Sequence, residues 1–160
     1  MKKLFYLALI ALVSVAFTSC GSKSSSSGSS SDAPDAYSPA NDTEEQIAEL
    51  GMAAFKAVIE GGDLAQYTEP GTSEELKAGI NQMNKENYER DHNEFGMVVK
   101  NARITSIEVT PEFGGGGITI TYDKEYTKVE GAEPTTTTCS FALKEVDGKY
   151  YILSETLNHK

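Results

Sequence analysis

The 160-residue sequence has no tryptophan and only two cysteines, Cys20 and Cys139. If Cys20 is used for another purpose, no intrachain disulfide can form, and the fold must be held by its hydrophobic core alone. Basic side chains are also few, because 14 Lys and Arg stand against 24 Asp and Glu. A surface with this charge repels nucleic acid and anionic lipid, so we expect no nucleic-acid partner.

Long apolar runs are equally scarce, and the one that stands out lies at the N-terminus. Lys2 and Lys3 precede an uncharged run from Leu4 to Phe17. Because a spanning helix needs roughly 20 apolar residues, this shorter run is typical of a secretory signal peptide. No later stretch is long enough to cross a membrane, so we expect the rest of the chain to lie outside the cytoplasm.

The signal ends in Phe17-Thr18-Ser19-Cys20-Gly21, which resembles the lipobox of bacterial lipoproteins. The resemblance implies that residues 1–19 are cleaved off and that Cys20 carries palmitate-like acyl chains. Two or more chains anchor a protein stably in a membrane. Since Gly21 gives no acidic signal for inner-membrane retention, we expect the periplasmic face of the outer membrane. The alternative is an ordinary signal peptide with a chance cysteine.

The remaining chain divides by composition into a tether and one domain. Residues 20–41 are rich in Ser, Gly, Pro and Ala and have little to bury, which is typical of disorder. Residues 42–160 have the length of one ordinary domain.

Two helices are predicted at the start of this domain. Apolar residues at spacings of three and four predict the first helix over residues 43–60, capped by Asp42 or Thr43 and stopped by Gly61-Gly62. A short turn follows over 63–67. The second helix is predicted over 73–90, with Thr72 and Glu75 as a capping box, and its apolar stripe is thin enough to leave it half exposed.

Four strands are predicted after the helices, over residues 102–110, 118–129, 135–146 and 149–157. The first breaks its alternation between Ile104 and Ile107, which indicates a bulge. Asp147-Gly148 is a hairpin signal that pairs Leu143 with Ile152. Its register predicts Tyr150, Ile152 and Ser154 on the same face as Phe141. An antiparallel meander with one apolar face needs a cover, so we predict an α+β fold, a curved four-stranded sheet packed on two to three N-terminal helices.

Two segments of the sequence resemble a known superfamily. They are residues 53–63 (AAFKAVIEGGD) and residues 141–152 (FALKEVDGKYYI). They are similar to the nuclear transport factor 2-like superfamily with its cystatin-like cone, and in particular to small bacterial lumazine-binding-like lipoproteins of unknown function. The resemblance implies a cone-shaped fold with an open pocket between the first helix and the sheet, and it implies no activity.

The candidate pocket residues are aromatic. On the face of the sheet that we expect to line the cone, tyrosines combine a flat apolar ring with a hydroxyl, which suits a small planar ligand and equally suits a core. The predicted pocket consists of Phe55, Tyr122, Tyr126, Phe141 and Tyr150.

No catalytic, metal or cofactor site is predicted. The strand pattern places no carboxylate on the apolar face, and Lys124 is expected to be an exposed rim lysine. His92 and His159 are too few for a metal site, which needs three or four ligands. Cys139 is expected to be a small core residue, because no basic neighbourhood that would activate a thiol is visible.

Two functions remain open. The first is a membrane-tethered, non-catalytic binding module that holds a small molecule or peptide in the cone, or a protein partner on the sheet's second face. That face carries Thr119, Thr121, Ala142, Tyr151 and Leu153, and a homodimer through it is a further expectation. The second is an isomerase- or dehydratase-like enzyme, which a buried carboxylate facing the tyrosines would favour.

Overall fold

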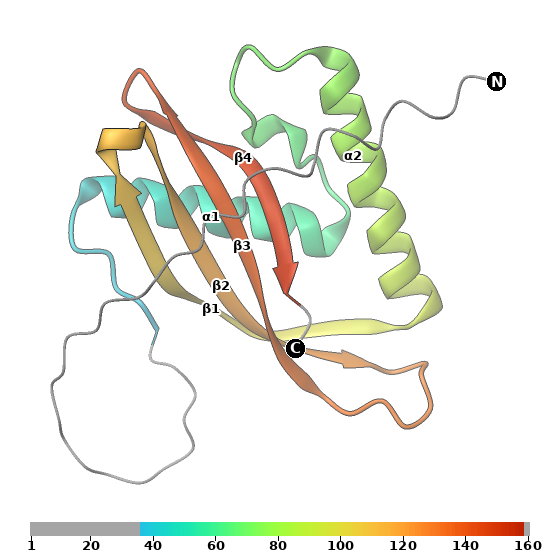
Figure 1. The fold of residues 1–160 in the computed structure, drawn as a ribbon. Coiled ribbons are helices and arrows are strands. Elements are labelled where there is room, and N and C mark those ends of the chain that lie inside the picture. Colours follow the sequence, from blue (N-terminus) through green and yellow to red (C-terminus); the bar gives the residue numbers. More distant parts are fainter. Residues whose placement is uncertain (1–35, 159–160) are drawn as a thin grey trace, which may run out of the picture. The chain divides into compact units, whose positions relative to one another are not determined.

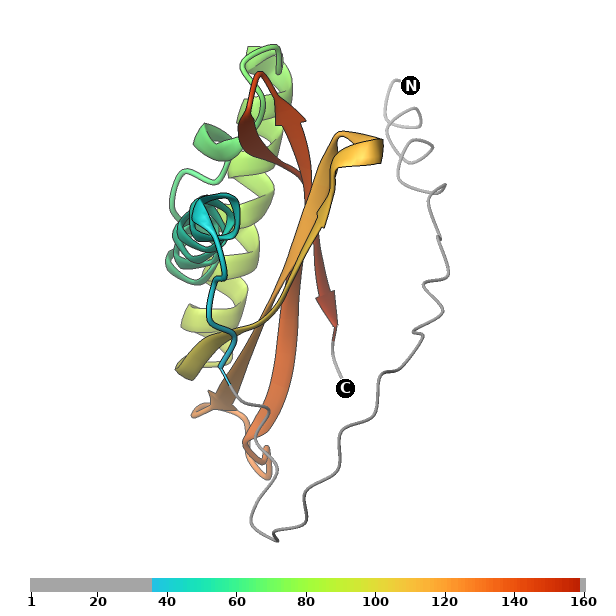
Figure 2. The same ribbon diagram turned by 90° about the vertical axis from the view of Figure 1, so that its left-hand side faces the viewer.

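The computed structural model describes residues 36–158. The signal peptide, Cys20, residues 21–35 and His159 lie outside these residues, so the expectations that concern them stay predictions. Within the described range the chain forms helices α1 (Asp42–Glu60) and α2 (Glu74–Tyr88), then strands β1 (Met97–Thr110), β2 (Gly115–Tyr126), β3 (Thr135–Val146) and β4 (Lys149–Asn158). Both helices cover one face of a single antiparallel sheet (Figures 1 and 2). The α+β fold class is confirmed.

Helix α1 begins at Asp42, and Asn41 caps it in place of the predicted Asp42 or Thr43. The side chain of Asn41 accepts the backbone N–H of Glu44 at 3.0 Å. The Glu44 carboxylate reaches back to the N–H of Ala40 at 2.8 Å and accepts the hydroxyl of Tyr37 at 2.6 Å. These donors, Tyr37 first, hold the pKa of Glu44 below its usual value. At its other end the helix closes on Gly61, whose left-handed φ of 63° confirms the predicted stop.

The apolar stripe of α1 is the centre of the core. Ile47, Ala54 and Phe55 are fully buried against the sheet. Gly51 lies directly over Ile118 of β2, and a Cβ at this position would meet the end of that side chain at 2.5 Å. The missing side chain therefore lets α1 approach the sheet closely at this point.

Helix α2 lies beside α1 and is partly open to solvent, as predicted. Ser73, rather than Thr72, caps it by accepting the N–H of Leu76. Asn84 fastens it to the end of α1 by donating to the carbonyl oxygens of Ala57 at 3.0 Å and Gly62 at 2.9 Å. Its last turn widens into a π-helix, η2 (Glu89–Glu94), before β1 starts.

The sheet is a meander in the order β1-β2-β3-β4. Asp147 and Gly148 turn the last hairpin with φ values of 52° and 76°, which pairs Leu143 with Ile152 as predicted. The predicted irregularity in β1 is present, with register shifts between Lys100 and Arg103 and between Ile104 and Ser106.

Strand β4 departs from the prediction at a bulge. Leu143 pairs with Ile152, but the next pair is Ala142 with Ser154, so Leu153 is an extra residue. The bulge reverses the alternation of all later side chains. Glu155, rather than Ser154, therefore shares the inner face with Phe141, and the predicted grouping of Ser154 with Tyr150 and Ile152 is wrong.

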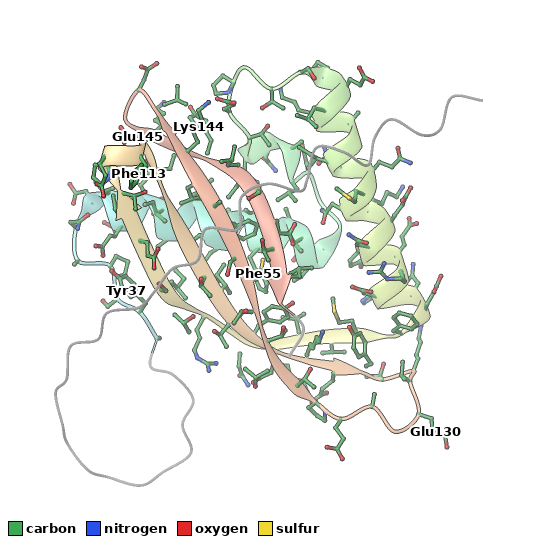
Figure 3. The ribbon with its side chains drawn as sticks, in the orientation of Figure 1. Tyr37, Phe55, Phe113, Glu130, Lys144 and Glu145 are labelled. Atoms are coloured by element: carbon green, nitrogen blue, oxygen red, sulfur yellow. The ribbon has the colours of Figure 1, made fainter. Side chains whose placement is uncertain are left out.

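The segment before α1 lies along the sheet. Residues 36–41, which the sequence assigns to the tether, have no helix or strand. The N–H of Tyr37 nevertheless donates to the carbonyl of Ile104 at 2.8 Å, on the outer edge of β1 (Figure 3). Strand β1 is an edge of the sheet. Its two bulges and this covering segment both hinder the addition of another strand, so the edge is protected.

Candidate functional site

Four of the five predicted pocket residues are packed as core. Phe55, Tyr122, Phe141 and Tyr150 are all buried in one apolar cluster. The rings of Phe55 and Tyr122 are 5.0 Å apart and tilted by 55°, a favourable aromatic packing. Tyr126 is only half-buried and meets Phe95 edge-on at 6.0 Å. These side chains fill the space between α1 and the sheet where the pocket was expected.

A polar group that the sequence analysis missed lies at one end of this core. The thiol of Cys139 on β3 points at Glu155 of β4, with 3.9 Å between Sγ and Oε1. Burial raises the pKa of Glu155. The pKa values of Cys139 and Tyr122 are also raised, by burial first and then by neighbouring groups that include Glu155. The expectation that no carboxylate lies on the apolar face is wrong, because the bulge at Leu153 turns Glu155 inward.

Lys124 belongs to the same end of the core. Its side chain is 7% exposed, so the expected exposed rim lysine is instead a buried one. The ammonium lies 5.4 Å from the centre of the Tyr126 ring, within the range of a cation–π contact. Among the described residues no buried side-chain nitrogen or oxygen lacks a hydrogen-bond partner.

His92 lies in the π-helix and stacks on Tyr88, with the ring centres 5.1 Å apart. Its neighbour Asp91 pairs with Arg90 at 2.9 Å. Between residues 36 and 158 no group of His, Cys, Asp and Glu side chains is arranged to hold a metal ion. In the same range no helix is both long and apolar enough to cross a membrane.

A hollow in the surface lies away from the predicted pocket. It has a volume of about 550 Å³ and opens between the α1–α2 connection, helix α2 and strand β4. Its lining mixes polar and apolar surface and includes the polar side chains of Asp63, Gln66, Lys77 and Asn81, with Tyr151 of β4 as the aromatic member. None of the five predicted pocket residues lines it.

A second, smaller hollow adjoins the first. It measures about 110 Å³ and shares Thr68 and Glu69 with the larger one. Its other walls are mainly apolar, from Leu76 and Ile80 of α2 and from Ile152 and Leu153 of β4. We call the two hollows together the α2–β4 groove.

The walls of the groove are held by side-chain contacts. Asn81 of α2 donates to the carboxylate of Asp63 at 2.7 Å and accepts the N–H of Ala65 at 2.9 Å. At the other side Lys144 of β3 donates to Glu69 at 2.6 Å, which fastens the α1–α2 connection to the sheet. The groove is thus formed by the fold itself and needs no ligand to shape it.

The sequence contained one signal for this groove. Helix α2 leaves Leu76, which lines the smaller hollow, 57% exposed. The thin apolar stripe on α2 predicted this exposure, although nothing in the sequence placed β4 beside it. The bulge supplies the opposite wall, since it leaves Leu153 65% exposed.

No family model and no curated protein matches the chain. Among solved structures it is similar to an NTF-2-like protein of unknown function from Shewanella oneidensis MR-1, with 13% identity, a TM-score of 0.48, and coverage of 72% of this chain and 98% of that chain. It is also similar to the intermembrane space region of the chloroplast protein ARC6, with 11% identity, a TM-score of 0.37, and coverage of 76% and 100%. The observed architecture is helices on one face of an antiparallel meander.

Proposed function

We propose that this protein is a membrane-tethered, non-catalytic binding module outside the cytoplasm, and that it holds a small ligand in the α2–β4 groove. The observation that carries the proposal is the position of the hollow. The space between α1 and the sheet is filled by Phe55, Tyr122 and Phe141, whereas about 550 Å³ is open beside α2. Ligand sites in proteins commonly measure about 300–1,000 Å³.

The charged side chains around the groove support binding rather than catalysis. Glu74 pairs with Lys77 at 2.9 Å, and Glu69 pairs with Lys144 at 2.6 Å. Asp63 already accepts the N–H of Gln66 at 3.1 Å in addition to Asn81. A general acid or base needs a pKa tuned by burial or by an uncompensated neighbour. These partly exposed, paired groups are better suited to orienting a bound molecule.

Two tyrosine variants test the site. Tyr151 lines the groove and Tyr126 lies at the end of the cone, and both are half-buried. We would screen the folded domain against a small-molecule library by ligand-detected NMR and repeat every hit with Tyr151→Ala and with Tyr126→Ala. The proposal expects binding to be lost in Tyr151→Ala and kept in Tyr126→Ala. The reverse pattern would return the site to the cone and refute the groove.

A second candidate function, an acid–base enzyme, is favoured by one specific observation. Glu155 is a carboxyl with a raised pKa that lies 3.9 Å from the Cys139 thiol and whose charge raises the pKa of Tyr122. A carboxyl whose pKa is raised by burial is a candidate for proton transfer. If it acts in this way, a bound ligand will exchange a carbon-bound proton for deuterium in heavy water, and Glu155→Gln will abolish the exchange. If the protein is a non-catalytic binding module, no exchange is expected with the unchanged protein or with Glu155→Gln.

A further inference from the structure

The two hollows of the α2–β4 groove differ in chemistry. The larger one presents carboxylate, amide and ammonium groups from Asp63, Gln66, Lys77 and Asn81. The smaller one presents the alkyl side chains of Leu76, Ile80, Ile152 and Leu153. Because both include Thr68 and Glu69, the two hollows are neighbours along the groove.

The polar hollow offers donors and acceptors in a mixed array. Gln66 and Asn81 contribute amides, Thr68 a hydroxyl and Tyr151 a phenol. The amides of Gln66 and Asn81 and the hydroxyl of Thr68 already make hydrogen bonds within the chain, so a ligand would use their remaining donor and acceptor positions. The flat Tyr151 ring combines an apolar face with a polar edge. Vicinal hydroxyl groups, which both donate and accept, match such an array better than a group that can only do one.

The charges around the groove argue against an ionic ligand. An anionic head in the larger hollow would meet the carboxylates of Asp63, Glu69 and Glu74. A cationic head would compete with Lys77, which lines this hollow and pairs with Glu74, and with Lys144, which lines the smaller hollow and pairs with Glu69. Placing a like charge against a carboxylate, or displacing a lysine from its ion pair, leaves a charge uncompensated and so costs binding energy. An uncharged, hydroxylated head avoids both conflicts.

The apolar hollow is built by the bulge in β4. The extra residue Leu153 lies beside Ile152 on the same hollow, opposite Leu76 and Ile80 of α2. An exposed leucine of this kind gains from contact with an alkyl group, since each buried methylene adds favourable transfer energy. The volume of about 110 Å³ is small, so it fits only a short alkyl segment.

We propose that the ligand of the α2–β4 groove is a neutral amphiphile, with a hydroxylated head of the sugar or polyol class in the polar hollow and an alkyl chain in the apolar one. The inference rests on the proposed function, because it names the ligand class of the same groove. It differs from that function in requiring both hollows to be occupied by one molecule.

Alkyl glucosides are the probe. The protein would be titrated with glucose and with ethyl, butyl, hexyl and octyl glucoside below their micelle concentrations, and amide shifts followed by NMR. Each added methylene is expected to tighten binding about two- to fourfold until the small hollow is full. Decanoate, an anionic amphiphile, is expected to bind at least about tenfold more weakly than octyl glucoside, because its head meets the carboxylates.

Two serine variants locate the alkyl chain of the ligand. Leu153→Ser removes the apolar wall at a side chain that is 65% exposed, so the fold is expected to survive. Phe113→Ser is the matched control, because Phe113 is 84% exposed in the β1–β2 turn, away from α2 (Figure 3). The dependence of affinity on the length of the alkyl chain is expected to vanish in Leu153→Ser and to persist in Phe113→Ser.

The outcomes separate this inference from the proposed function. Equal affinity for glucose and octyl glucoside, equal affinity for decanoate, or an unchanged chain-length dependence in Leu153→Ser would each overturn the amphiphile. If no glucoside binds but library hits are lost in Tyr151→Ala, the amphiphile fails and the proposed function stands. If neither glucosides nor library members bind at Tyr151, the proposed function fails as well.

Discussion

The carboxylate of Glu155 lies among buried side chains, and this position affects the free energy of folding. Burial raises its pKa in the folded protein above the reference value of 4.5. The folded state therefore binds this proton more tightly than the unfolded state, and ionised Glu155 opposes folding. This unfavourable contribution is absent below the unfolded pKa and grows as the pH rises through the folded pKa.

Replacement of this carboxyl by an amide is expected to stabilise the protein at neutral pH. Glu155→Gln should raise the Tm at pH 7, and the gain should disappear below about pH 4.5, where Glu155 is protonated in both states. Glu130→Gln is the control, because Glu130 is exposed in the turn between β2 and β3 (Figure 3). A Tm that falls in Glu155→Gln at pH 7 would show that the charge is compensated.

Cys139 is expected to be chemically inert in the folded protein. Its thiol is fully buried, and burial, with the added charge of Glu155, raises its pKa, so little thiolate forms. In a chain that starts at Ala33 and so lacks Cys20, alkylation by iodoacetamide should be at least about a hundredfold slower in buffer than in urea. Equal rates would indicate that this end of the core opens freely.

At the scale of elements, the close approach of α1 to the sheet depends on Gly51. Alanine normally stabilises a helix relative to glycine. At position 51, however, the new Cβ would meet Ile118 at 2.5 Å. Gly51→Ala is therefore expected to lower the free energy of unfolding by about 1–3 kcal/mol, as overpacked core substitutions do.

Gly79 provides the matched control for this effect. It lies in α2, and a Cβ there would meet nothing within 4 Å. Gly79→Ala is expected to raise the free energy of unfolding by roughly 0.5–1 kcal/mol through helix propensity alone. Urea unfolding of the two variants would measure both values, and a gain in both would contradict the tight packing of α1 on β2.

The elements themselves followed from local patterns, and the site did not. Helix periodicity, Gly61 and the Asp147-Gly148 turn act over a few residues, so α1 and the last hairpin were predicted with nearly their observed ends. The bulge at Leu153 arises where β4 is fitted to β3, and the local alternation does not show it. Because that one residue turns Glu155 inward and Leu153 towards α2, both the polar end of the core and the groove were missed.

The predicted pocket failed to appear for a similar reason. The sequence identified Phe55, Tyr122, Phe141 and Tyr150 as residues of the inner face, and this is confirmed. Whether such residues line a cavity or fill it depends on how closely α1 packs on the sheet. That distance is set by Gly51 against Ile118, a contact between segments far apart in the sequence.

At the scale of the whole molecule, the proposed function has two parts, binding in the groove and attachment to the membrane through Cys20. Lipidation of Cys20 stays a prediction, and so does a homodimer through the sheet's second face. The outer face of the described sheet is polar, with hydroxyl pairs such as Thr119 with Ser140 at 3.1 Å and Thr105 with Thr121 at 3.0 Å.

The two cysteines allow the anchor to be tested cleanly. Cells that produce the full chain would be labelled with an alkyne fatty acid and then fractionated. Cys20→Ser is expected to lose the label and leave the membrane fraction, because the acyl chains supply the attachment. Cys139→Ala should keep both, since that thiol is buried in the core. Label retained in Cys20→Ser would refute the lipoprotein assignment.

The central claim is that ligand binds beside α2 rather than inside the cone. The most direct measurement is a map of amide NMR shifts on the folded domain at saturating octyl glucoside. If the ligand binds in the α2–β4 groove, the largest shifts will cluster at Gln66, Asn81, Tyr151 and Leu153, which line the two hollows. Shifts centred on Phe55, Tyr122 and Cys139 would place the ligand in the cone and contradict the account.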